Sequence, residues 1–187
     1  DNVEIMKEII RKFPPLNNNP VEIRSMESKR YEKFLEKTVK VEPDEIKKVM
    51  LIGNCFRNTS FSSATAIFPT IQLYTELEII KKLKGEGYQV VYKLHPENLD
   101  KKIGFVKDLS VFEALFPKDV EINTERFEDT IAQVDAFAFY YTGTSTFGGA
   151  ITSQKPIWFF DVHTRDYPEK MMEFISDRCI YQPTELN

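Results

Sequence analysis

The sequence has no long apolar run and no surplus of basic charge. No apolar stretch approaches the roughly 20 residues that a membrane span needs, and the first residues lack the pattern of a signal peptide. Lysine and arginine number 25 against 29 aspartate and glutamate, which gives a net charge of -4 without a basic arm. The sequence therefore predicts a cytoplasmic protein with no nucleic-acid partner, in which local geometry holds any anionic ligand.

Cysteine and histidine are also scarce, with two of each in 187 residues. Cys55 and Cys179 lie far apart without metal-ligand spacing, which favours two reduced thiols over a disulfide framework. His163 follows Asp161 closely, but no third ligand accompanies that pair. We therefore expect no metal site.

The first part of the chain predicts a helical extension and linker over residues 1–47. Residues 6–13 have the apolar spacing of a short amphipathic helix, and residues 20–40 have that of a peripheral one. Pro43 and its acidic neighbours are typical of a linker. The chain begins with Asp1 and not with methionine, so we expect the numbering to start inside a longer polypeptide.

The rest of the chain, residues 48–187, alternates between apolar strands and amphipathic helices. Such alternation predicts an α/β fold, a Rossmann-like three-layer domain around a parallel sheet. We expect Leu73, Leu77, Ile80 and Leu83 on the buried face of one helix, and Thr124 as the N-cap of another. The expected strands are 48–54, 88–96, 119–124, 135–141 and 156–160, with 178–182 as a last strand or edge, and the expected helices are 70–87, 109–116, 126–134, two turns within 142–155, and 168–175.

Polar residues follow four of the expected strands, and in an open parallel sheet ligands bind outside the carboxyl ends of the strands. Loops are polar in any case, so each residue also has an ordinary interpretation. His95 would then cap a strand, Arg57 would be a surface residue, and Thr144 or Ser145 would be a helix N-cap. The candidate site residues are Gly53, Asn54, Arg57, His95, Pro96, Thr142, Gly143, Thr144, Ser145, Thr146 and Asp161.

The densest hydroxyl cluster, residues 142–146, fits none of the common catalytic loops. A P-loop needs a lysine where the sequence continues Gly149-Ala150, and a nucleophile elbow needs glycine where Phe147 stands. The dinucleotide fingerprint is absent after the first strand as well. A helix N-terminus with flanking hydroxyls can instead hold a phosphate, for which His95 would serve as the catalytic general acid.

Three segments in this order resemble a known family: "LIGNCFR", "YKLHP" and "FEDTIAQVDAFAFYYTGTSTFGGAITSQKPIWFFD". They are similar to the C-terminal, donor-binding half of bacterial GT-B glycosyltransferases of surface-polysaccharide synthesis. The likeness extends to CDP-glycerol glycerophosphotransferases and to sialyl- and Kdo-type transferases. It implies that His95-Pro96 and Ser145-Thr146 contact the phosphate of a CMP-, CDP- or UDP-activated donor. It implies no further cofactor.

A GT-B enzyme has two Rossmann-like domains, whereas this chain has room for one. The resemblance therefore implies a missing N-terminal acceptor domain, in the same or another chain, that supplies the base. By itself the chain would bind donor with little transfer, and the full enzyme would associate peripherally with a membrane. Two other hypotheses remain open: a serine hydrolase that uses Ser145, and a non-catalytic module whose N-terminal helices dock another protein.

Overall fold

A computed structural model describes residues 45–56, 68–99, 109–163 and 166–184, all within one compact unit of the chain. The helical extension expected before residue 45 and the candidate Arg57 lie outside these residues. None of the described helices combines the length and the apolar character that crossing a membrane requires.

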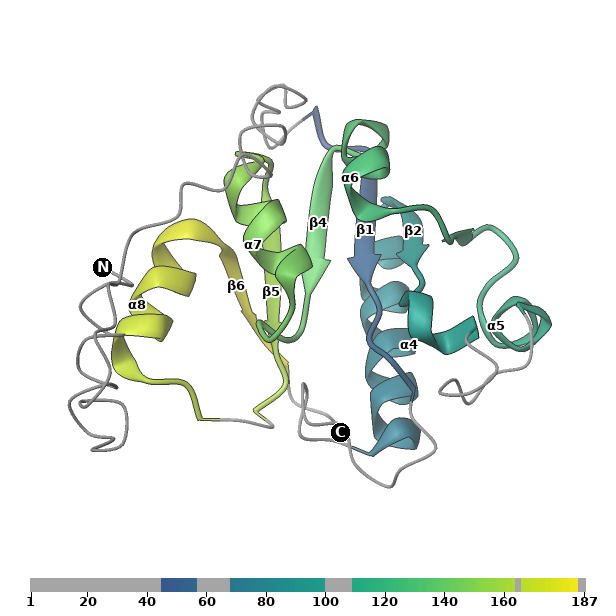
Figure 1. Ribbon diagram of the computed structural model, residues 1–187, viewed down its shortest axis with the longest axis horizontal. Coiled ribbons are helices and arrows are strands. Elements are labelled where there is room, and N and C mark those ends of the chain that lie inside the picture. The colour runs from purple at the N-terminus through teal and green to yellow at the C-terminus, as the bar shows by residue number, and fades with distance from the viewer. Residues whose placement is uncertain (1–44, 57–67, 100–108, 164–165, 185–187) are drawn as a thin grey trace, which may run out of the picture. The chain divides into compact units, whose positions relative to one another are not determined.

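The centre of the fold is a six-stranded sheet in which every neighbouring pair is parallel (Figure 1). This confirms the predicted Rossmann-like α/β fold, and residues near 180 form a true strand of the sheet. The strands follow the spatial order β3-β2-β1-β4-β5-β6. Their bounds are β1 Lys48–Ile52, β2 Gln89–Lys93, β3 Glu121–Asn123, β4 Ala136–Phe139, β5 Ile157–Asp161 and β6 Ile180–Pro183.

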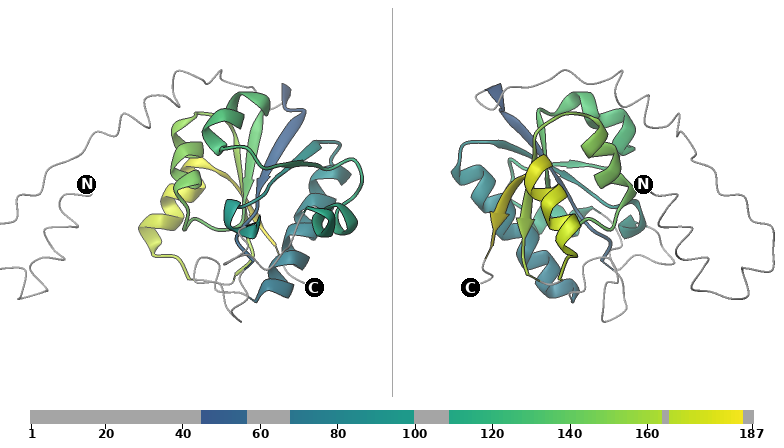
Figure 2. Two further views of the ribbon diagram at one scale, coloured as in Figure 1. Left: turned by 45° about the vertical axis from the view of Figure 1, so that its right-hand side comes forward. Right: turned by 90° about the vertical axis from the view of Figure 1, so that its left-hand side faces the viewer.

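Helices cover both faces of the sheet and enclose two separate apolar clusters (Figure 2). On one face α4 and α5 pack against the sheet through side chains such as Ile80 and Phe112. On the other face α6, α7 and α8 contribute Phe127, Phe147 and Ile175. The helices are α4 Pro69–Gly85, α5 Ser110–Leu115, α6 Phe127–Thr130, α7 Ser145–Thr152 and α8 Glu169–Arg178, with 3-10 turns Pro96–Leu99 and Ile131–Gln133.

Strand β1 stands at the point where the strand order reverses. It pairs with β2 on one side and with β4 on the other, so the chain runs outward in both directions from it. The loops that leave the carboxyl ends of β1 and β4 therefore diverge to opposite faces. In open α/β sheets the crevice between such loops is where ligands bind.

Two local predictions differ from the structure. Thr124 does not cap α6: the helix begins only at Phe127, and its N-cap Arg126 makes no side-chain cap bond. In α4 the fully buried positions include Gln72, Thr75 and Glu76, while the expected Leu73 and Leu77 are only partly buried. The side chain of Glu76 can point inward because the hydroxyls of Tyr92 on β2 and Tyr140 after β4 donate hydrogen bonds to its carboxylate.

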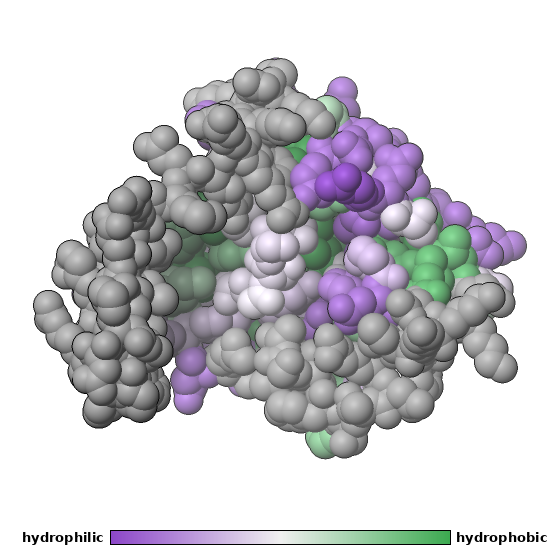
Figure 3. All heavy atoms as spheres, viewed as in Figure 1, coloured by the Kyte–Doolittle hydropathy of each residue, from purple (hydrophilic) through white to green (hydrophobic). Residues whose placement is uncertain are grey.

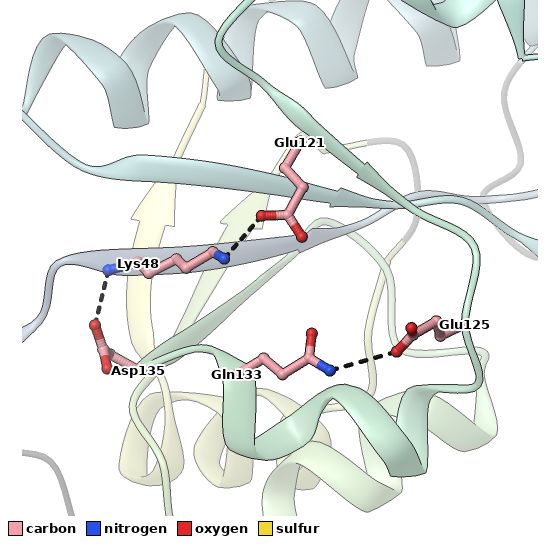
Figure 4. A network of polar contacts seen from close by, with 5 residues as sticks. All are labelled: Lys48, Glu121, Glu125, Gln133 and Asp135. Carbon is pink, nitrogen blue, oxygen red and sulfur yellow. Dashed lines mark hydrogen bonds and ion pairs between the residues drawn. The ribbon is translucent and has the colours of Figure 1, made fainter.

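The amino ends of three strands are joined by polar contacts (Figure 4). The carboxylate oxygen Oδ2 of Asp135 accepts hydrogen bonds from the backbone N–H groups of Lys47 and Lys48, at 2.9 and 2.8 Å. The ammonium of Lys48 pairs with Glu121 at 2.8 Å. These contacts fix the starts of β1, β3 and β4, whereas most of the candidate residues lie at the opposite edge.

Candidate functional site

Gly53 follows β1 directly, and its lack of a side chain is required by the ring of Tyr92. A Cβ atom placed on Gly53 would come within 2.3 Å of the Tyr92 hydroxyl oxygen and 2.4 Å of Cζ. The backbone of Gly53 is held on both sides, because its N–H donates to the carbonyl of Lys93 at 3.0 Å and its carbonyl accepts from Tyr141 at 3.2 Å. Gly53 thus lies at the switch point, fixed between the ends of β2 and β4.

Asn54 ties the loop after β1 to the turn after β2. Its side-chain oxygen accepts from the N–H of Cys55 at 2.8 Å, and its carbonyl accepts from the Asn98 amide at 3.1 Å. The Asn98 oxygen in turn accepts from the N–H of Phe56 at 2.6 Å. Both asparagines are buried, so these bonds hold the two loops in one fixed arrangement.

Glu76 of α4 is fully buried beneath these loops and was not among the residues selected from the sequence. Its carboxylate accepts hydrogen bonds from Tyr140 at 2.5 Å, from Tyr92 at 2.6 Å and from the N–H of Asn54 at 3.0 Å. Burial raises the pKa of Glu76 from its usual value to about 7, and the hydrogen bonds from Tyr140, Tyr92 and Asn54 oppose that rise. A helical projection places Glu76 on the same face as Ile79, Ile80 and Leu83, and this position in the sequence could have indicated that Glu76 is buried.

His95 and Pro96 follow β2, as the sequence predicts. His95 is half-buried, and its Nδ1 atom accepts from the backbone N–H of Glu97 at 3.3 Å, while Pro96 is exposed at the start of the 3-10 turn. The parallel pairing of β1 with β2 also brings Cys55 beside this turn. One potential ligand atom each from Cys55, His95 and Glu97 lies within 4.8 Å of the other two.

The hydroxyl cluster forms the start of α7. Thr144 is the N-cap and accepts from the N–H of Thr146 at 3.3 Å, which confirms one of the two predicted caps. Ser145 is exposed, and Thr146 is half-buried. Figure 3 shows that the surface over α7 is near neutral in hydropathy. The edge of Phe147 packs on Phe139 with ring centroids 5.0 Å apart, so the first turn of α7 is anchored to β4.

Asp161 ends β5, but its carboxylate is occupied by the fold. Oδ1 accepts from the N–H of His163 at 2.9 Å, and Oδ2 accepts from the hydroxyl of Tyr181 at 2.6 Å. Within the described part of the chain, the Ser145 hydroxyl makes no hydrogen bond to either histidine. The geometry therefore does not assemble a triad of Ser145, His163 and Asp161.

Lys93, the last residue of β2, is a second residue that the sequence reasoning missed. Only 5% of it is exposed, and its ammonium donates to the carbonyl of Leu94 at 3.1 Å. Burial lowers the pKa of Lys93, which Glu128 and Glu125 partly oppose. Its register partner on β3 is Asn123, whose buried side-chain oxygen has no hydrogen-bond partner within the described residues. In the sequence, Lys93 could have been identified as a charged residue at the end of the apolar run "VVYK".

Comparisons with known proteins give a weak likeness to solved structures. No protein-family model matches the chain. No curated protein matches it either. Among solved structures, the chain is similar to the KpsC β-Kdo 2,4-transferase of Thermosulfurimonas dismutans, with a TM-score of 0.47 and 13% identity. The match covers 70% of this chain and 42% of that one, so the chain spans less than half of the length of the solved structure.

Proposed function

We propose that the chain is the donor-binding domain of a glycosyl- or glycerophosphoryltransferase of bacterial surface-polysaccharide synthesis. One observation carries the proposal: α7 begins at the carboxyl edge of the sheet with a capped N-terminus and a cluster of hydroxyls. The hydroxyl of Tyr141, three residues before the N-cap, bonds to Gly53 across the switch point. The resemblance of the HP and Ser/Thr segments to transferases with nucleotide-activated donors supports the same function.

The chemistry asks for groups that stabilise a departing phosphate. When the bond between the sugar and the phosphate oxygen breaks, negative charge collects on the nucleotide phosphate. The N–H groups of the first turn of α7 and the hydroxyls of Ser145 and Thr146 would donate hydrogen bonds to that phosphate, helped by the helix dipole. His95 would act as the general acid or as a fixed donor, and the buried ammonium of Lys93 belongs to the last residue of β2.

The acceptor, and the base that activates it, would come from a further domain in the same or another chain. The donor would be a cytidine or uridine nucleotide carrying a sugar or glycerol phosphate. We propose that the described domain binds this donor and that transfer requires the acceptor domain.

Calorimetric titration with CMP, CDP, UDP and their activated sugars tests the proposal. We expect one nucleotide to bind, and the double variant Ser145→Ala/Thr146→Ala to weaken binding about tenfold or more, because hydrogen bonds to a charged phosphate contribute about 1.5–3 kcal/mol. Thr152→Ala is the matched control, since Thr152 lies in the last turn of the same helix and donates to the carbonyl of Gly148. The proposal fails if no nucleotide binds, or if both variants weaken binding equally.

A further inference from the structure

We propose that Cys55, His95 and Glu97 form a binding site for a zinc ion. This inference does not depend on the proposed function, because it concerns the affinity of the chain for the metal alone. With zinc bound, His95 would serve the proposed function as a fixed donor and not as the general acid. Cys55 belongs to the loop after β1, while His95 and Glu97 belong to the turn after β2. Cys55 and His95 are 40 positions apart in the sequence, so no short sequence motif indicates the three-residue site.

The three side chains offer one thiolate sulfur, one imidazole nitrogen and one carboxylate oxygen, the ligand types that zinc takes in proteins. Bond lengths of about 2.0–2.3 Å in a tetrahedron place such atoms about 3.5 Å from one another. In this structure the three ligand atoms lie within 4.8 Å of one another. Side-chain movements of about 1 Å would bring these atoms to the separations of a tetrahedral zinc site.

The backbone that carries the three residues is held in place by buried hydrogen bonds. Asn98 bonds to both Asn54 and Phe56, the two residues that flank Cys55. Cys55 also donates its N–H to the Asn54 side chain. Metal sites depend on such support, because it reduces the conformational freedom that binding must remove.

Zinc fits the group better than magnesium or calcium, which prefer oxygen ligands. Three protein ligands leave a fourth tetrahedral position for water or for an oxygen of a bound molecule. Binding converts the Cys55 thiol to a thiolate and releases its proton to solvent, so affinity rises with pH. The long contact of 3.3 Å between the Glu97 N–H and Nδ1 of His95 is weak enough for the metal to replace it.

Cobalt titration of the full chain after dialysis against a chelator tests the site, with zinc added afterwards as competitor. We expect one cobalt ion per chain, a thiolate-to-cobalt charge-transfer band, and loss of the band when zinc is added. Cys55→Ser should abolish the band. Glu97→Gln should weaken binding about tenfold while leaving the fold intact, because Glu97 is only half-buried.

Cys179→Ser is the matched control, since Cys179 is the other buried cysteine and packs in the apolar cluster of α6, α7 and α8. It should retain the band in full. Circular dichroism establishes that each variant is folded. The proposal is overturned if the wild-type chain shows no charge-transfer band at stoichiometric cobalt. It is also overturned if Glu97→Gln binds as tightly as wild type, or if Cys179→Ser loses the band.

Discussion

Gly53 makes room for the ring of Tyr92, which is fixed at both of its ends. The Tyr92 hydroxyl bonds to Glu76, and the ring packs edge-on against Phe116 with centroids 4.5 Å apart. The ring cannot move aside without breaking the bond or the packing. Any side chain at Gly53 would therefore force the loop after β1 away from the sheet.

Gly53→Ala should lower the free energy of unfolding by about 3 kcal/mol, in the upper range for overpacking a buried site. The control is Gly85→Ala, where an added Cβ meets no heavy atom within 4 Å at the end of α4. That change should be neutral or stabilise by up to about 1 kcal/mol. Urea unfolding measures both. Equal stability of the two variants would show that Tyr92 is not fixed over Gly53.

At the scale of single residues, the sequence predicted the location of site candidates better than their partners. Polar residues after strands identify the carboxyl edge, because parallel strands all end there. Asn54 and Asp161 nevertheless bond within the fold, to Asn98 and to Tyr181. Such partners lie in segments distant along the chain, and apolar periodicity carries no information about them.

Among the elements, α7 combines a structural residue with a ligand-binding candidate in adjacent positions. Thr144 caps the helix, whereas Ser145 is exposed. The cap satisfies one of the N–H groups that every helix leaves without an internal partner at its start. We therefore expect the Thr144 hydroxyl to affect stability and the neighbouring Ser145 hydroxyl to affect ligand binding.

Thr144→Ala should lower the free energy of unfolding by about 1 kcal/mol, the usual cost of removing a cap. Ser145→Ala should change it by less than about 0.5 kcal/mol, because surface substitutions away from caps and cores have small effects. Thermal or urea unfolding of the two variants, side by side, checks the difference. A Ser145→Ala variant that is the less stable of the two would contradict the assignment of the cap.

The long elements were predictable, and the short ones were less so. Strands β4 and β5 are apolar on both faces, and α4 spans seventeen residues. In contrast, α6 has only four residues before it tightens into a 3-10 turn, and the N-cap predicted for it, Thr124, was wrong. Phe127, the first residue of that helix, packs against Phe137 of β4, and this contact is tertiary.

For the molecule as a whole, Glu76 connects the helix layer to three neighbouring segments. It belongs to α4 and accepts bonds from Tyr92 on β2, from Tyr140 after β4 and from Asn54 after β1. A carboxylate at the centre of the fold makes stability depend on pH. The folded state binds the proton more tightly than the unfolded state, because burial raises the pKa of Glu76.

The stabilising contribution of protonated Glu76 should be complete below pH 4.5 and be lost as pH rises towards 7. Relative to Glu76→Gln, the wild type should therefore lose up to about 3 kcal/mol between pH 4.5 and pH 8. Glu86→Gln, at the exposed end of the same helix, should follow the wild-type curve. Unfolding in urea across this pH range measures the difference. Parallel curves for wild type and Glu76→Gln would refute it.

Asp135 has a consequence for how the strands find their registry during folding. Its carboxylate accepts hydrogen bonds from two backbone N–H groups at the beginning of β1. One of these belongs to Lys48, which lies 87 residues earlier in the chain. If β4 slipped by one residue, Phe137 and Phe139 would exchange faces with their neighbours, and Asp135 would lose both donors. The register of β1 and β4 is thus determined by two independent features, the burial of apolar side chains and the hydrogen bonds of the Asp135 carboxylate at the amino ends of the strands. These hydrogen bonds can form only after the chain between β1 and β4 has folded back on itself.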